Sequence, residues 1–176
     1  REIDEIIVIT NSKFISRFRA WAAKHPAKKH ITLVDDLTKT HSDRRGAIGD
    51  MNFAINKKRI KEDLLVIGGD NLFDGDLNDF LDFTKGHKNN PVIGAYNIRR
   101  LDAAREYGVI QLDKKDKVID FEEKPNQPKS VLVAMCLYYF PKDKLRLIKE
   151  YLNAKANKHD ATGFYIDWLT KKEPVF

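Results

Sequence analysis

Three short stretches of the sequence carry residues whose types and spacing could handle phosphates. The first stretch is an apolar run followed by Gly68-Gly69-Asp70-Asn71. In open α/β sheets, ligands gather at the carboxyl ends of the strands, and Mg²⁺ binds one or two carboxylates together with water and phosphate oxygens. We therefore interpret Asp70 as a magnesium ligand at the end of a buried strand. The alternative is a turn or helix-capping aspartate, which is common after any strand.

The second stretch is a strand-like run that ends in Glu123-Lys124-Pro125. Side chains alternate between the two faces of a strand, so Glu123 shares a face with the apolar residues Ile119 and Phe121. A carboxylate on that face is costly without a partner, and a substrate hydroxyl or a cation would supply one. Lys124 projects to the other face unless Pro125 turns the chain. The alternative is a surface ion pair at the end of a strand.

The third stretch places two aspartates around the start of a predicted helix near the end of the sequence. Asp160 precedes this helix, where its carboxylate could reach into a site, and Asp167 falls within the helix. The alternative is that Asp160 or Thr162 only caps the helix. No Ser/His/Asp or Cys/His arrangement suggests a covalent nucleophile, and Cys136 lies in an apolar run typical of a core residue.

These stretches need a scaffold, which the spacing of the apolar residues predicts. Apolar runs predict strands at 5–10, 30–34, 64–67, 91–96, 107–112, 118–123 and 131–140. Apolar residues at helical spacing predict helices at 13–24, 47–59, 77–84, 143–152 and 163–172. Strands and helices alternate in the first half, and two strands are joined through residues 113–116 in the second. We therefore expect an α/β fold with a mostly parallel sheet and an inserted antiparallel hairpin.

The bulk composition excludes several classes of protein. The chain has 176 residues, of which 42% are hydrophobic and 33% charged, with a formal net charge of +6. Its lysines lie in short clusters interleaved with acidic residues, without the aromatic–basic pattern that stacks single-stranded nucleic acid, so we expect no nucleic-acid binding. No apolar run approaches the ~20 residues that span a bilayer, and no signal peptide precedes the first strand. We therefore expect a cytoplasmic protein without a membrane partner.

Taken in order, these motifs resemble those of the nucleotidyltransferase family that makes nucleotide sugars, such as the glucose-1-phosphate thymidylyltransferases. The motifs that carry the resemblance are Gly69-Asp70-Asn71, Tyr107-Gly108-Val109, Phe121-Glu122-Glu123-Lys124-Pro125, and Asp160 with the helix after it. The resemblance implies a Rossmann-like α/β/α sandwich formed by one domain over residues 1–176. It also implies an enzyme that transfers a nucleotidyl group from a nucleoside triphosphate (NTP) to a sugar 1-phosphate and releases pyrophosphate.

The resemblance further implies roles for individual residues. Asp70 would bind the catalytic Mg²⁺, with Asp160 as the second carboxylate and Asp167 as the reserve. Lys124 would pair with the acceptor phosphate and is, with Asp70, the other expected catalytic residue. The remaining substrate contacts that it implies are Gly46 near the nucleotide base, Gly69 and Asn71 beside Asp70, Gly108 against the sugar, and Glu123 at the sugar hydroxyls.

Two departures from the family bear on these expectations. The glycine-rich loop whose arginine and downstream lysine grip the triphosphate is missing from the sequence. We expect this loop and the first strand of the sheet to lie N-terminal to Arg1, and we expect the 176-residue chain alone to be inactive. The strand at 131–140 carries Met135-Cys136 where the family tends to have a glycine near the sugar.

Two other functions therefore stay open. One is a cytidylyltransferase for a phosphorylated alcohol such as phosphocholine. The other is a catalytically silent subunit that binds a nucleotide or a sugar phosphate. The sequence names neither the sugar nor the base, and it also leaves a homo-oligomer open.

Overall fold

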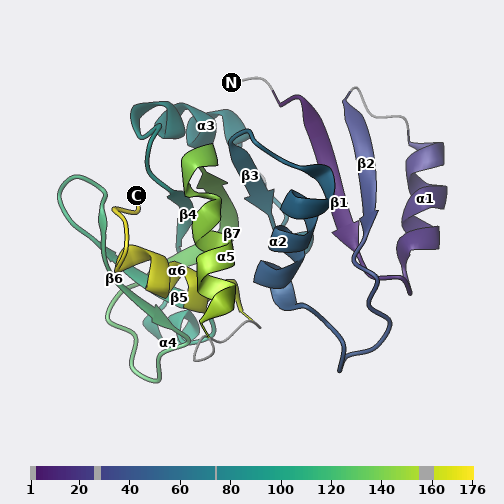
Figure 1. Ribbon diagram of the computed structural model, residues 1–176. Coiled ribbons are helices and arrows are strands. Elements are labelled where there is room, and N and C mark those ends of the chain that lie inside the picture. Colours follow the sequence, from purple (N-terminus) through teal and green to yellow (C-terminus); the bar gives the residue numbers. More distant parts are fainter. Residues whose placement is uncertain (1–2, 26–28, 74, 155–160) are drawn as a thin grey trace. The chain divides into compact units, whose positions relative to one another are not determined.

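The computed structural model describes residues 3–25, 29–73, 75–154 and 161–176 (Figure 1). The chain forms two compact units, residues 1–60 and residues 61–176, each with its own set of strands and helices. None of the described helices has the length and apolar character needed to cross a membrane. That residues 1–176 belong to one domain stays a prediction.

The first unit is a strand–helix–strand arrangement followed by a second helix. It contains β1 (Glu5–Thr10), α1 (Ile15–Lys24), β2 (His30–Asp35) and α2 (Gly46–Lys58). β1 and β2 pair in parallel, with Glu5 opposite His30 and Thr10 opposite Asp35. A parallel pair needs a crossover connection, which α1 provides. The parallel arrangement expected for the first half of the sequence is therefore confirmed for these two strands.

The first unit also buries two carboxyl groups next to each other. Asp36 is 5% exposed and accepts hydrogen bonds from the backbone N–H and the hydroxyl of Thr38, at 2.7 and 2.8 Å. Oδ1 of Asp50, on α2, is buried and has no hydrogen-bond partner among the described residues. Burial, and then the negative charge of Asp36, raise the pKa of Asp50 to about 6.

We expect the variant Asp50→Asn to be more stable than the wild type at pH 8, by about 1 kcal/mol after allowance for partial exposure. The folded-state pKa lies above the ordinary value of 3.8. The wild type is therefore fully stabilised below about pH 4 and loses stability as the pH rises through about 6. Urea unfolding of both proteins at pH 4 and pH 8 tests this, and a difference that is equal at the two pH values would contradict it.

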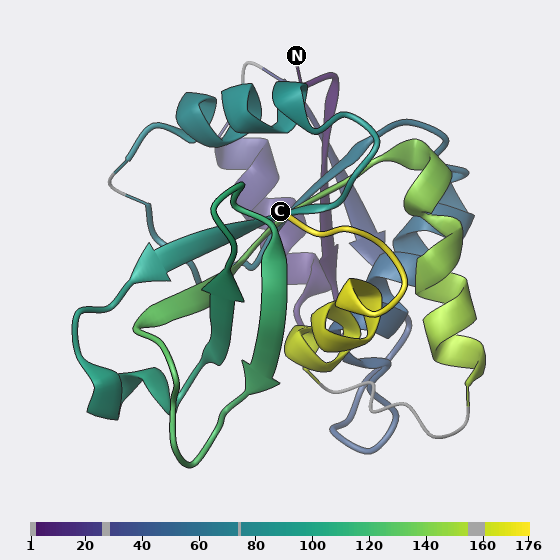
Figure 2. The ribbon, with the colours of Figure 1, turned by 90° about the vertical axis from the view of Figure 1, so that its left-hand side faces the viewer.

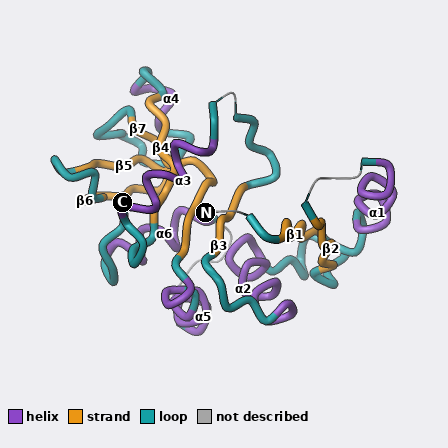
Figure 3. The backbone as a smooth tube through the Cα atoms, turned by 90° about the horizontal axis from the view of Figure 1, so that it is seen from above, coloured by secondary structure: helices purple, strands orange, loops and turns teal. Residues whose placement is uncertain are grey.

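The second unit holds a sheet of five strands. Its elements are β3 (Leu64–Ile67), α3 (Leu77–Gly86), β4 (Val92–Asn97), α4 (Leu101–Ala104), β5 (Gly108–Leu112), β6 (Val118–Glu123), β7 (Leu132–Phe140), the 3₁₀ turn η1 (Lys142–Lys144), α5 (Arg146–Asn153) and α6 (Thr162–Thr170). The predicted hairpin is confirmed, because β5 and β6 pair antiparallel with Gly108 opposite Glu123. Strands β4, β5, β6 and β7 lie side by side in Figure 3.

The sheet of the second unit is antiparallel, so the prediction of a mostly parallel sheet is wrong for this part of the chain. β7 pairs antiparallel with β3 on one edge and with β4 on the other. β3 and β4 therefore run in the same direction, as expected for strands joined by a helix, but β7 lies between them. β7 returns from the hairpin and runs against both neighbours. The three-layer sandwich of the whole chain stays a prediction.

β7 is irregular at its centre, next to Cys136. Along β4, Ile93 pairs with Tyr138 but Ala95 pairs with Ala134. One residue of β4 thus faces three residues of β7. Such bulges are over-represented next to active sites, where they redirect side chains. Here the bulge brings Cys136 toward the end of β3, where the backbone N–H of Gly68 donates to the carbonyl of Cys136 at 2.8 Å.

α5 and α6 pack against each other through aromatic side chains. The rings of Tyr151 and Tyr165 meet edge to face at 5.2 Å, and Tyr165 also meets Phe140 of β7 at 5.8 Å. Tyr151, Tyr165 and Phe140 are fully buried, and edge-to-face pairs add stability beyond the area they bury. α6 lies beside β6, as Figure 2 shows with α6 in yellow. The first turn of α6 is thereby held close to Glu123.

Candidate functional site

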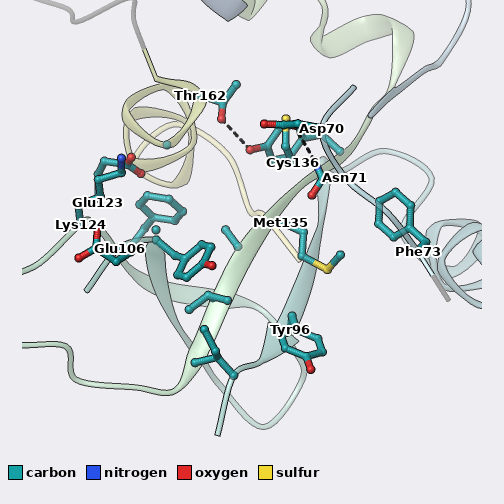
Figure 4. Close-up of a pocket in the computed structure, with 18 of the residues that line it drawn as sticks. Asp70, Asn71, Phe73, Tyr96, Glu106, Glu123, Lys124, Met135, Cys136 and Thr162 are labelled. Atoms are coloured by element: carbon teal, nitrogen blue, oxygen red, sulfur yellow. Dashed lines mark hydrogen bonds between the residues drawn. The ribbon is translucent and has the colours of Figure 1, made fainter. Parts of the chain in front are cut away.

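The second unit has a pocket of about 930 Å³ between the turn after β3, the sheet and the first turn of α6. Figure 4 shows two polar regions in it. Asp70 and Asn71 lie at one end, and Glu106, Glu123 and Lys124 lie at the other. Backbone and side chains of the bulged part of β7 form the floor between them, including Met135 in Figure 4. We call these regions the aspartate end and the lysine end of the pocket.

The aspartate end is built by a tight turn after β3. The backbone N–H of Asn71 donates to the carbonyl of Gly68 at 3.1 Å, and Nδ2 of the Asn71 side chain donates to the same carbonyl at 3.3 Å. Asp70 is exposed to the pocket and forms no ion pair with any described residue. The carboxylate of Asp70 accepts one long hydrogen bond, from Nδ2 of Asn71 at 3.4 Å. A carboxylate without a cationic partner among the described residues, in an open pocket, suits Mg²⁺, which keeps several waters and takes its other ligands from phosphates.

The second carboxylate of the expected metal site is not seen at this end. Asp160 lies outside the described residues. Asp167 lies on α6, where it pairs with Lys171 at 2.7 Å, and it does not line the pocket. The described residues hold no group of three or more side chains arranged to bind a metal. Within the described part of the chain, Asp70 is therefore the only one of the predicted metal ligands that lines the pocket.

The two glycines before Asp70 differ in how closely other residues approach them. A Cβ on Gly68 would lie 2.9 Å from Cβ and Sγ of Cys136 and 2.6 Å from Nδ2 of Asn71. A Cβ on Gly69 would meet nothing within 4 Å. Gly68 is thus required by the close approach of β7, whereas the Gly69 position has room for a side chain.

We expect Gly68→Ala to lower the free energy of unfolding by about 1–3 kcal/mol, because the added methyl group displaces Cys136 or the Asp70 turn. Gly69→Ala is the matched control, and we expect it to change stability by less than about 0.5 kcal/mol. Urea unfolding of the two variants measures the difference. Equal losses in both variants would contradict this reading of the turn.

The lysine end positions Glu123 between two glycines. Gly108 lies opposite Glu123 in the β5–β6 hairpin, and a Cβ on Gly108 would lie 2.6 Å from Cζ of Phe121 and 3.2 Å from Oε2 of Glu123. A Cβ on Gly163 in α6 would lie 1.7 Å from the same oxygen. Burial raises the pKa of Glu123, while the charge of Lys124 lowers it. Glu123 accepts no hydrogen bond from the described residues, so its carboxylate is available to a ligand.

Lys124 directly follows β6 and has a left-handed backbone conformation. Its φ is 47°, and its backbone N–H donates to the carbonyl of Tyr107 at 3.1 Å. This conformation, just before Pro125, turns the chain so that Lys124 and Glu123 line the same pocket (Figure 4). A non-glycine residue in this conformation costs about 1–2 kcal/mol, and such strain clusters at functional sites.

One detail of the predicted β6 face is wrong. Ile119 was expected to share the face of Phe121 and Glu123, but its side chain is 60% exposed while Phe121 is buried. The pairing of β5 and β6 shifts register at this point: Gln111 faces Asp120, and the next residue of β5 faces Val118. Ile119 is therefore the extra residue of a bulge, and alternation holds only from Asp120 onward.

A comparison with family models decides the relationship. The model described as nucleotidyl transferase matches residues 1–173 of the chain. The chain belongs to this family. The assignment to a nucleotidyltransferase family, which rested on the motifs, is thereby confirmed.

Over part of its length, the chain is similar to several curated proteins. It is 29% identical over 117 residues to a glucose-1-phosphate adenylyltransferase of Thermosipho africanus, covering 65% of the chain and 28% of the relative. It is 33% identical over 102 residues to the same enzyme of Lachnospira eligens, covering 56% and 24%. It is 29% identical over 119 residues to the bifunctional protein GlmU of Methanocaldococcus jannaschii, covering 68% and 27%. The matched residues thus span about a quarter of the length of these relatives.

The pocket of the second unit brings together most of the predicted site residues. Those that line it are Asp70, Asn71, Gly108, Glu123 and Lys124. Gly69 lies in the turn beside them. Gly46 belongs to the first unit, where it begins α2 with a φ of 72°. The assigned roles of all these residues stay predictions.

Sequence reasoning missed other residues that line the pocket, notably Glu106, Tyr96 and Tyr138. Glu106 sits directly before Tyr107-Gly108, so its closeness to a motif was the available signal. Tyr138 lies in an apolar run and shows no such signal. Cys136 is partly buried and lines the pocket, so its interpretation as a core residue is not confirmed. Burial raises the pKa of its thiol.

Proposed function

We propose that this nucleotidyl transferase moves a nucleotidyl group from an NTP to a sugar 1-phosphate, forming a nucleotide sugar and releasing pyrophosphate. The observation that carries the proposal is one pocket lined by the carboxylate of Asp70 at one end and by the carboxylate of Glu123 and the ammonium group of Lys124 at the other. The similar glucose-1-phosphate adenylyltransferases and GlmU support the same class of substrate. We also propose that Asp160 supplies a second carboxylate and that Gly46 contacts the base.

In the proposed reaction, an oxygen of the acceptor phosphate forms a bond to the α-phosphorus of the NTP. The bond from that phosphorus to the pyrophosphate oxygen breaks, and the pyrophosphate leaves. Such a transfer needs positioning and charge neutralisation more than covalent chemistry by the protein. Bound Mg²⁺ would neutralise phosphate charge and orient the reacting groups.

In this proposal, the metal would bind at the aspartate end of the pocket and the acceptor at the lysine end. Asp70 would hold the metal. Lys124 would pair with the acceptor phosphate, because an ammonium is a compact point charge suited to phosphate oxygens. Glu123 would accept hydrogen bonds from the acceptor hydroxyls, and these bonds would replace the solvation that its half-buried carboxylate has lost. The apolar floor would lie under the sugar ring.

A second candidate is cytidylyl transfer to a phosphorylated alcohol such as phosphocholine. The observation that favours it is the presence of Tyr96, Tyr107 and Phe121 in the pocket together with Glu106 and Glu123. Aromatic faces attract quaternary ammonium groups, and carboxylates add to that attraction. A simple sugar phosphate has no cationic group that would use this combination.

A pyrophosphate-release screen of the full-length gene product tests both candidates. The nucleoside triphosphates are combined with several sugar 1-phosphates and with phosphocholine, each with and without Mg²⁺. We expect Mg²⁺-dependent release with at least one sugar 1-phosphate. Release with phosphocholine alone would favour the second candidate. Nucleotide binding without release for any pair would favour a catalytically silent subunit and overturn the proposal.

A further inference from the structure

The hydroxyl of Tyr138 ties β7 to the first turn of α6. It donates to Oγ1 of Thr162 at 2.9 Å, the dashed line at Thr162 in Figure 4. Tyr138 is 3% exposed, and burial holds the pKa of its hydroxyl well above the ordinary value, so it remains a donor at any physiological pH. The residue before the helix, Ala161, offers no side-chain cap. The hydrogen bond from Tyr138 therefore fixes the first turn of α6 to β7.

The same turn of α6 supports Glu123. Gly163 follows Thr162 directly, and Oε2 of Glu123 lies where a Cβ of Gly163 would be. The carboxylate thus rests against bare backbone, with Gly108 on its other side. Because no described residue donates a hydrogen bond to Glu123, packing against these glycines sets its position. A shift of the first turn of α6 would move Glu123 as well.

The same strand also reaches the aspartate end. Cys136, two residues before Tyr138 on β7, packs against Gly68 at the start of the Asp70 turn. The two polar ends of the pocket are therefore built against the same segment of β7. Contacts of this kind fix distances between groups that must meet one ligand.

We propose that Tyr138 and Thr162 are positioning residues, whose hydrogen bond holds the first turn of α6 against Glu123 and so sets the affinity for the acceptor. This inference rests on the proposed function, in which Glu123 binds the acceptor. Both residues line the pocket, and the proposed reaction assigns neither of them a contact to the reacting atoms. Their effect passes through Gly163 to the carboxylate.

The test compares Tyr138→Phe with Tyr139→Phe in the full-length gene product. Tyr139 is the neighbour on β7, is 4% exposed, and donates an equally short hydrogen bond, 2.8 Å to Oδ2 of Asp63, away from the pocket. Both variants lose one buried hydroxyl. We expect Tyr138→Phe to raise the KM for the acceptor about fivefold to tenfold, with kcat and the KM for the NTP within about twofold. Tyr139→Phe should leave all three constants unchanged.

Changes at Thr162 provide a second check. We expect Thr162→Val to match Tyr138→Phe, the double variant to be no worse than either single one, and Thr162→Ser to restore the wild-type KM. Non-additivity of this kind is the mark of a direct interaction. The proposal is overturned if the acceptor KM of Tyr138→Phe stays within twofold, or if Tyr139→Phe raises it equally.

A measurement that does not depend on catalysis tests the positioning role independently of the proposed function. The carboxyl of Glu123 can be titrated by NMR, and its pKa is raised by burial in the wild type. If the first turn of α6 loosens in Tyr138→Phe, water reaches the carboxyl and its pKa falls toward the ordinary value. Tyr139→Phe should leave it raised. A protein inactive in the pyrophosphate screen but with this pattern would lose the proposed function and keep the positioning role, whereas equal pKa values in both variants would overturn the positioning role.

Discussion

Asp70→Asn should lower Mg²⁺-dependent pyrophosphate release by the full-length gene product about a thousandfold, with the fold unchanged. The substitution keeps the size of the side chain and its contacts in the turn but removes its charge. A neutral amide is a poor ligand for Mg²⁺, which prefers one or two carboxylates. Because Asp70 is exposed and forms no ion pair with a described residue, its loss should not destabilise the turn. Initial rates at several Mg²⁺ concentrations measure the effect.

Asp116→Asn is the matched control for this variant. Asp116 is an exposed aspartate in the β5–β6 turn with a φ of 59°, a conformation that asparagine also tolerates. It loses the same charge away from the pocket, so we expect wild-type rates and an unchanged dependence on Mg²⁺. Wild-type turnover in Asp70→Asn would rule out the metal role of Asp70.

Lys124→Gly should raise the KM for the acceptor by about 10–100-fold, the range expected for a lost charge-assisted contact to phosphate. The KM for the NTP should stay within about twofold. Stability should not fall, because glycine adopts the left-handed conformation freely and the relieved strain offsets the larger entropy of the unfolded chain. The variant therefore separates function from stability. Steady-state kinetics and urea unfolding measure the two effects.

Arg59→Gly provides the control, because it also removes a positive charge and also replaces a residue that has a left-handed backbone conformation. Arg59 is an exposed cation at the end of α2 with a φ of 52°, and it belongs to the first unit. We expect a similar small effect on the free energy of unfolding and no effect on either KM. Equal increases in the KM for acceptor and NTP in Lys124→Gly would argue against an acceptor-phosphate role for Lys124.

Local sequence was sufficient for most elements and for the candidate residues. The strands Glu5–Thr10, Leu64–Ile67 and Val118–Glu123 have the predicted bounds, because each contains residues that favour strands and is flanked by glycine or by polar or charged residues. The motifs around Asp70 and Glu123 could also be found in the sequence, since each combines a strand end with residue types suited to phosphates or hydroxyls. Helix α4 was missed, because four residues are too few to show a helical period.

The tertiary structure decided what depends on residues far apart in the chain. The direction of β7 follows from its pairing with β3, more than sixty residues earlier, and no local pattern encodes that partner. The same holds for Gly163, which looks like an ordinary helix residue until Glu123 is seen to lie against it. Local sequence sets backbone preference and burial within a few residues, whereas a pocket exists only after distant segments pack together. The sequence therefore determined which residues could act, and the packing of β7 and α6 determined which of them meet.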